Sequence, residues 1–180
     1  MLQLFSFGNL KVEGSTAIFN FCSSRDCPSE KLNLCKQPDK CYAKKSERLF
    51  RNVIRHRNFQ AKFWEMCTPD LFVYELNKFA YNKLRFSESG DFRSQKDVDK
   101  ASAIANPLDV PVWTYTARRD LDFTNLPANF TVNGSGFMID NLFNVVPDPT
   151  GLPKVICISD CRICKYCSNK SGLVINCKIH

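Results

Sequence analysis

The sequence predicts a single α/β domain over residues 1–180, built from β/α units that resemble a partial or abbreviated TIM-like barrel. Three observations support this fold class. β-prone runs alternate with helical segments, which is typical of parallel strands joined by helices. The chain has 180 residues, fewer than the roughly 200–250 that a full eight-fold barrel needs. Its cysteines gather in loops near the two ends of the chain, and no repeat or linker divides it.

The first half of the chain predicts one strand, one long loop and two helices. Residues 15–21 are β-prone and end at a cysteine, whereas residues 23–40 are polar and contain two prolines, which predicts a loop. Residues 42–65 have helical spacing, and Thr68-Pro69 is a typical start for a second helix that extends to about residue 82. The expected apolar side of the first helix consists of Leu49, Val53, Phe59 and Phe63.

The second half predicts alternating short strands and one helix. The expected helix covers residues 94–105 and ends before Pro107. The expected strands are residues 84–87, 112–116, 130–132, 155–156 and 173–175, with turns at residues 88–91 and 133–136. In parallel sheets the loops at the carboxyl ends of the strands build the site. We therefore expect one face to gather Cys22, residues 89–91, residues 115–116, residues 133–135 and Cys157.

The ten cysteines indicate metal binding rather than a disulfide framework, because they form two tight groups. Cys67 stands apart beside a helix start and is expected to be a small buried apolar residue. The first group is Cys22, Cys27, Cys35 and Cys41, and the second is Cys157, Cys161, Cys164, Cys167 and Cys177.

The spacing Cys161-x2-Cys164-x2-Cys167 is typical of cubane iron–sulfur sites of the 4Fe–4S type. Zinc sites more often use two separated Cys-x2-Cys pairs, and disulfides between such close cysteines would be strained. Ten cysteines suffice for one or two clusters, and their spacing does not say how they divide between two sites. The expected ligands are Cys27, Cys35, Cys41, Cys161, Cys164 and Cys167, with Cys22, Cys157, Cys177 and His180 as further candidates.

The net charge of +7 would suit a nucleic-acid partner, but bound thiolate clusters would offset part of it. We therefore expect only weak nucleic-acid binding. The apolar start of the chain lacks the features of a signal peptide, and no apolar run approaches the roughly 20 residues of a membrane span. These features predict a protein that is not secreted and has no membrane partner.

Several polar residues near the expected strand ends are candidates for catalysis or ligand binding. Asp91 and Tyr115 are candidate catalytic residues, although Asp91 could instead cap the following helix and Tyr115 could be a half-buried strand tyrosine. Asn133 could bind a ligand or belong to a turn. The candidate ligand-binding residues are Ser89, Gly90, Asp91 and Asn133.

Four stretches of the chain, in order, resemble a known family. They are the entry at Cys27, Cys35 and Cys41 that leads into Tyr42-Ala43, the Ser89-Gly90-Asp91-Phe92 turn after Arg85, the Trp113-Thr114-Tyr115-Thr116 strand end, and Cys161-x2-Cys164-x2-Cys167 closed by His180. Together they resemble the phage gene-product-88 family of small viral proteins. The resemblance implies a viral origin, the host cytoplasm as the setting, and a domain similar to trimmed radical-enzyme barrels.

The spacing Cys157-x3-Cys161-x2-Cys164 is also that of radical S-adenosylmethionine enzymes. Those enzymes carry it after their first barrel strand, whereas here it lies near the C-terminus, so S-adenosylmethionine is the weaker cofactor expectation. The leading hypothesis is an iron–sulfur protein with a redox or radical-type role and a small-molecule substrate or redox partner. The alternative is a zinc-stapled module that binds host protein or nucleic acid. The sequence leaves open whether the chain is an enzyme.

Overall fold

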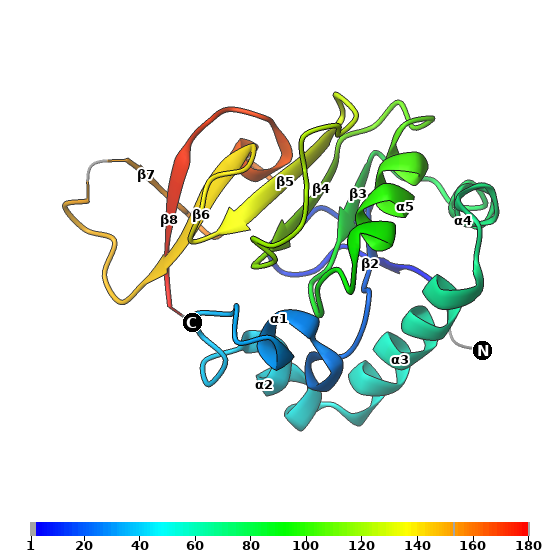
Figure 1. The fold of residues 1–180 in the computed structure, drawn as a ribbon, viewed down its shortest axis with the longest axis horizontal. Helices are drawn as coiled ribbons and strands as arrows, with labels where there is room; N and C mark the ends of the chain where they lie inside the picture. Colours follow the sequence, from blue (N-terminus) through cyan, green and yellow to red (C-terminus); the bar gives the residue numbers. More distant parts are fainter. Residues whose placement is uncertain (1–2, 153, 180) are drawn as a thin grey trace.

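The computed structural model describes residues 3–152 and 154–179, which form one eight-stranded sheet and five α-helices (Figure 1). Within these ranges no helix is long and apolar enough to cross a lipid bilayer. The strands are β1 (Ser6–Phe7), β2 (Thr16–Phe19), β3 (Lys83–Phe86), β4 (Val112–Thr116), β5 (Phe130–Ser135), β6 (Asn141–Val146), β7 (Val155–Ile156) and β8 (Val174–Lys178). The helices are α1 (Pro28–Lys31), α2 (Tyr42–Leu49), α3 (Arg51–Met66), α4 (Pro69–Leu76) and α5 (Gln95–Ala105), with 3-10 turns η1 (Ser24–Asp26) and η2 (Tyr166–Ser168).

The strands lie in the order β1-β2-β3-β4-β5-β6-β8-β7. Every neighbouring pair is parallel except β1 and β2, which are antiparallel. The expected α/β class with parallel strands is therefore confirmed. The sheet is open, with β1 and β7 at its two edges, so it does not close into a barrel.

The two faces of the sheet have different surroundings because side chains alternate along each strand. Leu84 and Phe86 of β3 are fully buried in the apolar core, which also contains Trp64 of α3 and Phe72 of α4. Helices α3, α4 and α5 lie beside the β2–β4 half of the sheet, whereas β6, β8 and β7 lie at the other end of the molecule (Figure 1). Arg85 alternates with these core residues and faces the other side, where a cavity lies.

The helical regions differ from expectation in three places. The predicted helix over residues 42–65 is two helices, because Phe50 has an extended backbone (φ −130°, ψ 103°). Helix α4 ends at Leu76 rather than near residue 82, and the expected loop over residues 23–40 contains the short α1. The predicted apolar side of the first helix is confirmed only in part, since Phe63 packs against the core whereas Phe59 is 39% exposed and Leu49 59% exposed. The buried residues of α3 are Arg57, Gln60 and Trp64.

The strands of the C-terminal half extend further than the sequence predicts. Residues 133–135, expected as a turn, continue β5, and Asn133 pairs in register with Tyr115 of β4 and Asn141 of β6. Strand β6 was not predicted. It lies inside the sheet between β5 and β8, so it joins the C-terminal strands to the rest of the fold.

Candidate functional site

A cavity of about 930 Å³ lies on the sheet face opposite the helical core, next to the carboxyl ends of the strands. Its wall includes Arg85 and Tyr115 from the strands, and Ser89, Gly90 and Asp91 from the segment between β3 and α5. Both cysteine groups reach it. The eight cysteines that line the cavity are Cys27, Cys35, Cys41, Cys157, Cys161, Cys164, Cys167 and Cys177.

The first cysteine group enters the cavity from the segment around α1 and α2. Cys27 directly precedes α1, and Cys41 directly precedes α2. Each has an extended backbone and occupies the N-cap position of the helix that follows. The amide of Cys35 donates to the carbonyl of Ser29 at 3.0 Å, which folds the loop back onto α1. Burial raises the pKa of the Cys27 thiol to about 12. This thiol therefore stays protonated near neutral pH unless a cation binds it.

Asp91 anchors this segment to the sheet. Its carboxylate accepts hydrogen bonds from Ser29 Oγ (2.5 Å), Thr116 Oγ1 (2.7 Å) and the amides of Ala117 (2.9 Å) and Phe92 (2.8 Å). Burial raises the pKa of Asp91, and these hydrogen bonds oppose the rise. The alternative of a helix cap is wrong, because the residue that caps α5 is Ser94. Asp91 thus positions the Cys27 segment, while its direct catalytic role stays a prediction.

Gly90 and Cys22 are packed against each other below the cavity wall. Gly90 has φ +80°, and a Cβ atom added there would lie 2.4 Å from Cys22 Sγ. Cys22 is only 5% exposed and is not among the residues that line the cavity. Burial raises the pKa of its thiol to about 11. A ligand role for Cys22 therefore stays a prediction, whereas its contact with Gly90 explains why a glycine occupies this turn.

The second cysteine group lies on the segment after β7 and on β8. Cys157 follows β7 directly, and its interaction with the Cys177 thiol lowers the pKa of Cys157 and raises that of Cys177. Burial raises the pKa of Cys167 to about 12, although the Tyr115 hydroxyl donates a hydrogen bond to its sulfur. Burial likewise raises the pKa of Tyr115 well above its usual value, which keeps that hydroxyl protonated as a donor.

Asn133 holds the second cysteine group rather than lining the cavity. Its side-chain amide donates to the carbonyls of Cys167 (2.8 Å) and Thr114 (3.0 Å), and its oxygen accepts from Asn141 Nδ2 (3.0 Å). Asn133 is fully buried and lies within β5, so the alternative of a turn residue is wrong. Its geometry gives it a positioning role, and direct contact with a cofactor stays a prediction.

The two cysteine groups face each other because the loop between α1 and α2 contacts the far part of the sheet. Lys36 Nζ donates to the carbonyl of Gly136 at 3.3 Å, and Gln37 Nε2 to that of Val145 at 3.4 Å. Val145 of β6 pairs in register with Cys177 of β8. The loop that carries Cys35 therefore lies next to the strand that carries Cys177.

The cysteines other than Cys177 are free thiols, and Cys67 is buried as expected. Across residues 3–152 and 154–179, no three His, Cys, Asp or Glu side chains converge tightly enough to hold a single metal ion. The thiols are instead distributed around the cavity. His180 lies outside the described residues.

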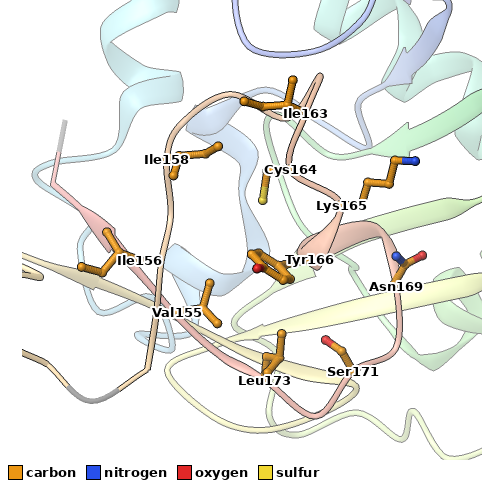
Figure 2. Close-up of a pocket in the computed structure, with 10 residues that line it drawn as sticks. All are labelled: Val155, Ile156, Ile158, Ile163, Cys164, Lys165, Tyr166, Asn169, Ser171 and Leu173. Carbon is orange, nitrogen blue, oxygen red and sulfur yellow. The ribbon is translucent and has the colours of Figure 1, made fainter.

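A second hollow, of about 720 Å³, opens on the surface of the C-terminal segment. Figure 2 shows its wall, which is formed mainly by Val155, Ile156, Ile158, Ile163, Tyr166 and Leu173 around Cys164. Cys164 also lines the central cavity, so it lies between the inner site and the surface. The second cysteine group is consequently closer to solvent on this side.

Among the residues of the cavity wall to which sequence reasoning assigned no site role are Thr16, Arg85 and Ser87. A signal for Arg85 is present, because a charged residue between two apolar ones in a strand must face away from the core. The sequence offers no such signal for Ser87. Its left-handed backbone (φ +57°) is uncommon for serine, so the residue type does not predict this conformation.

A family model described as Gene product 88 matches residues 5–149 of the chain. No curated protein and no solved structure matches it. The family match includes the first cysteine group and the Asp91 turn, and it ends before Cys157. The second cysteine group therefore lies outside the matched region.

Proposed function

The chain belongs to the gene product 88 family, and from this premise we propose that it is a phage iron–sulfur protein with a redox or radical-type role in the cytoplasm of the infected host. One observation carries the proposal: eight cysteines from the two cysteine groups line one cavity. Structural thiols that only fill a core have no reason to gather around an empty space. Ligands of a polynuclear cluster do, because the cluster occupies more room than one ion.

The thiols and their surroundings fit an iron–sulfur cluster. Burial raises the pKa of Cys27 and of Cys167 to about 12, and cluster binding would offset this by replacing the protons with iron. Positive charge acts on the second cysteine group, since Arg85 and Lys11 lie near Cys161, and the chain as a whole has a net charge of +7. These positive charges favour an anionic cluster.

The chain's own residues would hold and tune such a cluster. When bound, an iron–sulfur cluster supplies one-electron transfer, with a potential set by burial and by hydrogen bonds to sulfur. Asn133 holds the Cys167 backbone, and the Tyr115 hydroxyl donates to the Cys167 sulfur. Asp91 holds the segment of Cys27 through Ser29. These residues fix both cysteine groups to the ends of β3, β4 and β5.

The strand order supports the partial-barrel interpretation and, with it, a radical-type role. The sheet places β2, β3, β4, β5 and β6 side by side in chain order and in parallel, as in an eight-fold barrel. In doubly wound sheets the strand order instead reverses partway along the sheet. The Cys157-x3-Cys161-x2-Cys164 motif follows β7 directly. It thus begins at a strand's carboxyl end, as in radical enzymes, but at the opposite end of the chain, so we do not extend the proposal to S-adenosylmethionine.

The test is anaerobic purification of the full chain, followed by its visible spectrum and its iron, zinc and acid-labile sulfide content. We expect brown protein with iron matched by sulfide, near four or eight per chain for one or two cubane clusters. Zinc without sulfide would overturn the proposal and favour the zinc-stapled module.

A further inference from the structure

The central cavity contains polar groups that the protein itself leaves without partners. In the described part of the chain, three buried side-chain atoms have no hydrogen-bond partner: Thr16 Oγ1, Arg85 Nε and Ser87 Oγ. All three residues line the central cavity. Buried polar groups in folded proteins are normally paired, and leaving one unpaired is costly. Three such groups on one cavity wall indicate that a bound molecule supplies the partners.

Arg85 is the charged member of this set and is held in a fixed place. It lies in the middle of β3, between the core residues Leu84 and Phe86, so its side chain must point away from the core. Its guanidinium carbon lies 5.6 Å from the centre of the Tyr115 ring, and Nη1 lies 3.5 Å from Glu88 Oε1. Neither contact uses Nε, which remains available to an acceptor in the cavity.

Ser87 and Thr16 extend the same surface along the strands. Ser87 follows β3, is 5% exposed and holds a left-handed backbone with φ +57°, a conformation that is strained for serine and is found preferentially at functional sites. Its amide donates to the carbonyl of Phe19 at 2.8 Å, which fixes the turn. Thr16 is fully buried and pairs in register with Lys83, two residues before Arg85.

We propose that Arg85, Ser87 and Thr16 bind an anionic small-molecule substrate, whose carboxylate or phosphate group lies against Arg85 between the two cysteine groups. An oxyanion supplies the acceptor that the Arg85 guanidinium needs, and other polar atoms of the substrate would pair with the hydroxyl groups of Thr16 and Ser87, which lie on either side of Arg85 along the strands. The cavity volume of about 930 Å³ is within the range of small-molecule sites. The inference rests on the proposed function for the chemistry done on the substrate, but the anion site can be tested separately.

The test is isothermal titration of the full, anaerobically purified chain with inorganic phosphate and, separately, with succinate. The two arms distinguish a phosphate group from a carboxylate. The variants are Arg85→Gln, Arg85→Lys and Ser87→Ala, and Arg51→Gln, on the exposed side of α3, is the matched control. We expect one probe to bind wild type and Arg51→Gln equally, and Arg85→Gln at least about tenfold more weakly, as for loss of a hydrogen bond to a charged group. The affinities of Arg85→Lys and Ser87→Ala for this probe should lie between those of the wild type and Arg85→Gln.

Binding of neither probe to the wild type would overturn the inference, and so would binding that Arg85→Gln and Ser87→Ala leave unchanged. Ser87→Ala keeps the test decisive if Arg85→Gln fails to fold. Iron and sulfide content, measured on the same samples, separates the two proposals. Anion binding that depends on Arg85 in iron-free protein supports the anion site alone, whereas iron with Arg85-independent binding supports the cluster alone.

Discussion

Gly90 is a residue of the cavity wall that tolerates little change. Its backbone is left-handed (φ +80°), and an added Cβ would lie 2.4 Å from Cys22 Sγ and 2.8 Å from the Cys22 amide nitrogen. We expect Gly90→Ala to lose about 1–2 kcal/mol from backbone strain and a further 1–3 kcal/mol from crowding against Cys22. Urea unfolding measures the sum.

Gly172 provides the matched control for this prediction. It also has a left-handed backbone (φ +63°), but an added Cβ would meet nothing within 4 Å. Gly172→Ala should therefore show the strain without the crowding. Equal losses in the two variants would mean that the close approach of Gly90 to Cys22 is unimportant for stability.

At the scale of elements, Glu47 joins α2 to the segment that carries the first cysteines. Its carboxylate accepts from the Ser24 amide (2.8 Å), from Ser24 Oγ (2.7 Å) and from Arg57 Nη1 of α3 (2.8 Å). Both charged side chains are almost fully buried. Removing one partner of such a pair leaves the other charge buried alone, so Glu47→Ala should lose about 3–5 kcal/mol in urea unfolding. A loss below about 1 kcal/mol would contradict this role.

The same carboxyl group predicts a pH dependence of stability. Burial raises the pKa of Glu47, but hydrogen bonds from Ser24 and Arg57 outweigh this and hold it below the usual 4.5. Since the folded pKa is the lower one, this contribution is complete above about pH 4.5 and is lost as the pH falls through the folded pKa. Unfolding free energy should therefore fall more steeply in acid for wild type than for Glu47→Gln. Parallel curves from pH 7 to pH 3 would contradict the prediction.

Strand β5 positions the second cysteine group through Asn133. Replacing Asn133 by alanine removes the donors to the Cys167 and Thr114 carbonyls, each worth about 1 kcal/mol. We expect Asn133→Ala to increase the reactivity of the metal-free thiols toward a thiol reagent about fivefold, because the Cys167 loop opens more often. Asn144→Ala is the control, since the Asn144 side-chain amide also lines the cavity but donates to Asn176 Oδ1 of the neighbouring strand (3.3 Å). Unchanged reactivity would leave Asn133 without a positioning role.

The sequence predicted which elements exist better than it predicted which faces they bury. The strands at residues 112–116 and 84–87 were anticipated because β-prone residues define them locally. The buried side of α3 was anticipated only at Phe63, because its most deeply buried residues are Arg57, Gln60 and Trp64, whereas Phe59 is exposed. Gln60 donates to the carbonyl of Leu4 (2.8 Å) and accepts from Asn20 Nδ2 (2.9 Å). These partners are distant in sequence, so no local sequence pattern predicts the contacts.

At the scale of the whole molecule, parallel topology explains why part of the site could be predicted. Carboxyl ends of parallel strands meet at one edge, and the structure brings Ser89–Asp91, Tyr115 and Cys157 to one cavity as that rule implies. The unpaired groups of Thr16, Arg85 and Ser87 could not be predicted, because an unsatisfied hydrogen bond is a property of the packed chain. The contact of the Cys35 loop with β6 is likewise a tertiary feature.

The arrangement of the whole chain predicts that the two cysteine groups hold separate clusters. Burial raises the pKa of Cys35 and of Cys161, and within each group a neighbouring thiol, Cys41 or Cys164, raises it further. The groups come from opposite ends of the chain and face each other across the cavity. We therefore expect a triple Cys→Ser variant at positions 27, 35 and 41, and another at positions 161, 164 and 167, to keep about half of the wild-type iron and sulfide each, because two clusters of equal size would bind independently. Near-complete loss of iron in both variants, with the fold intact by circular dichroism, would mean instead that one cluster is shared by the two groups.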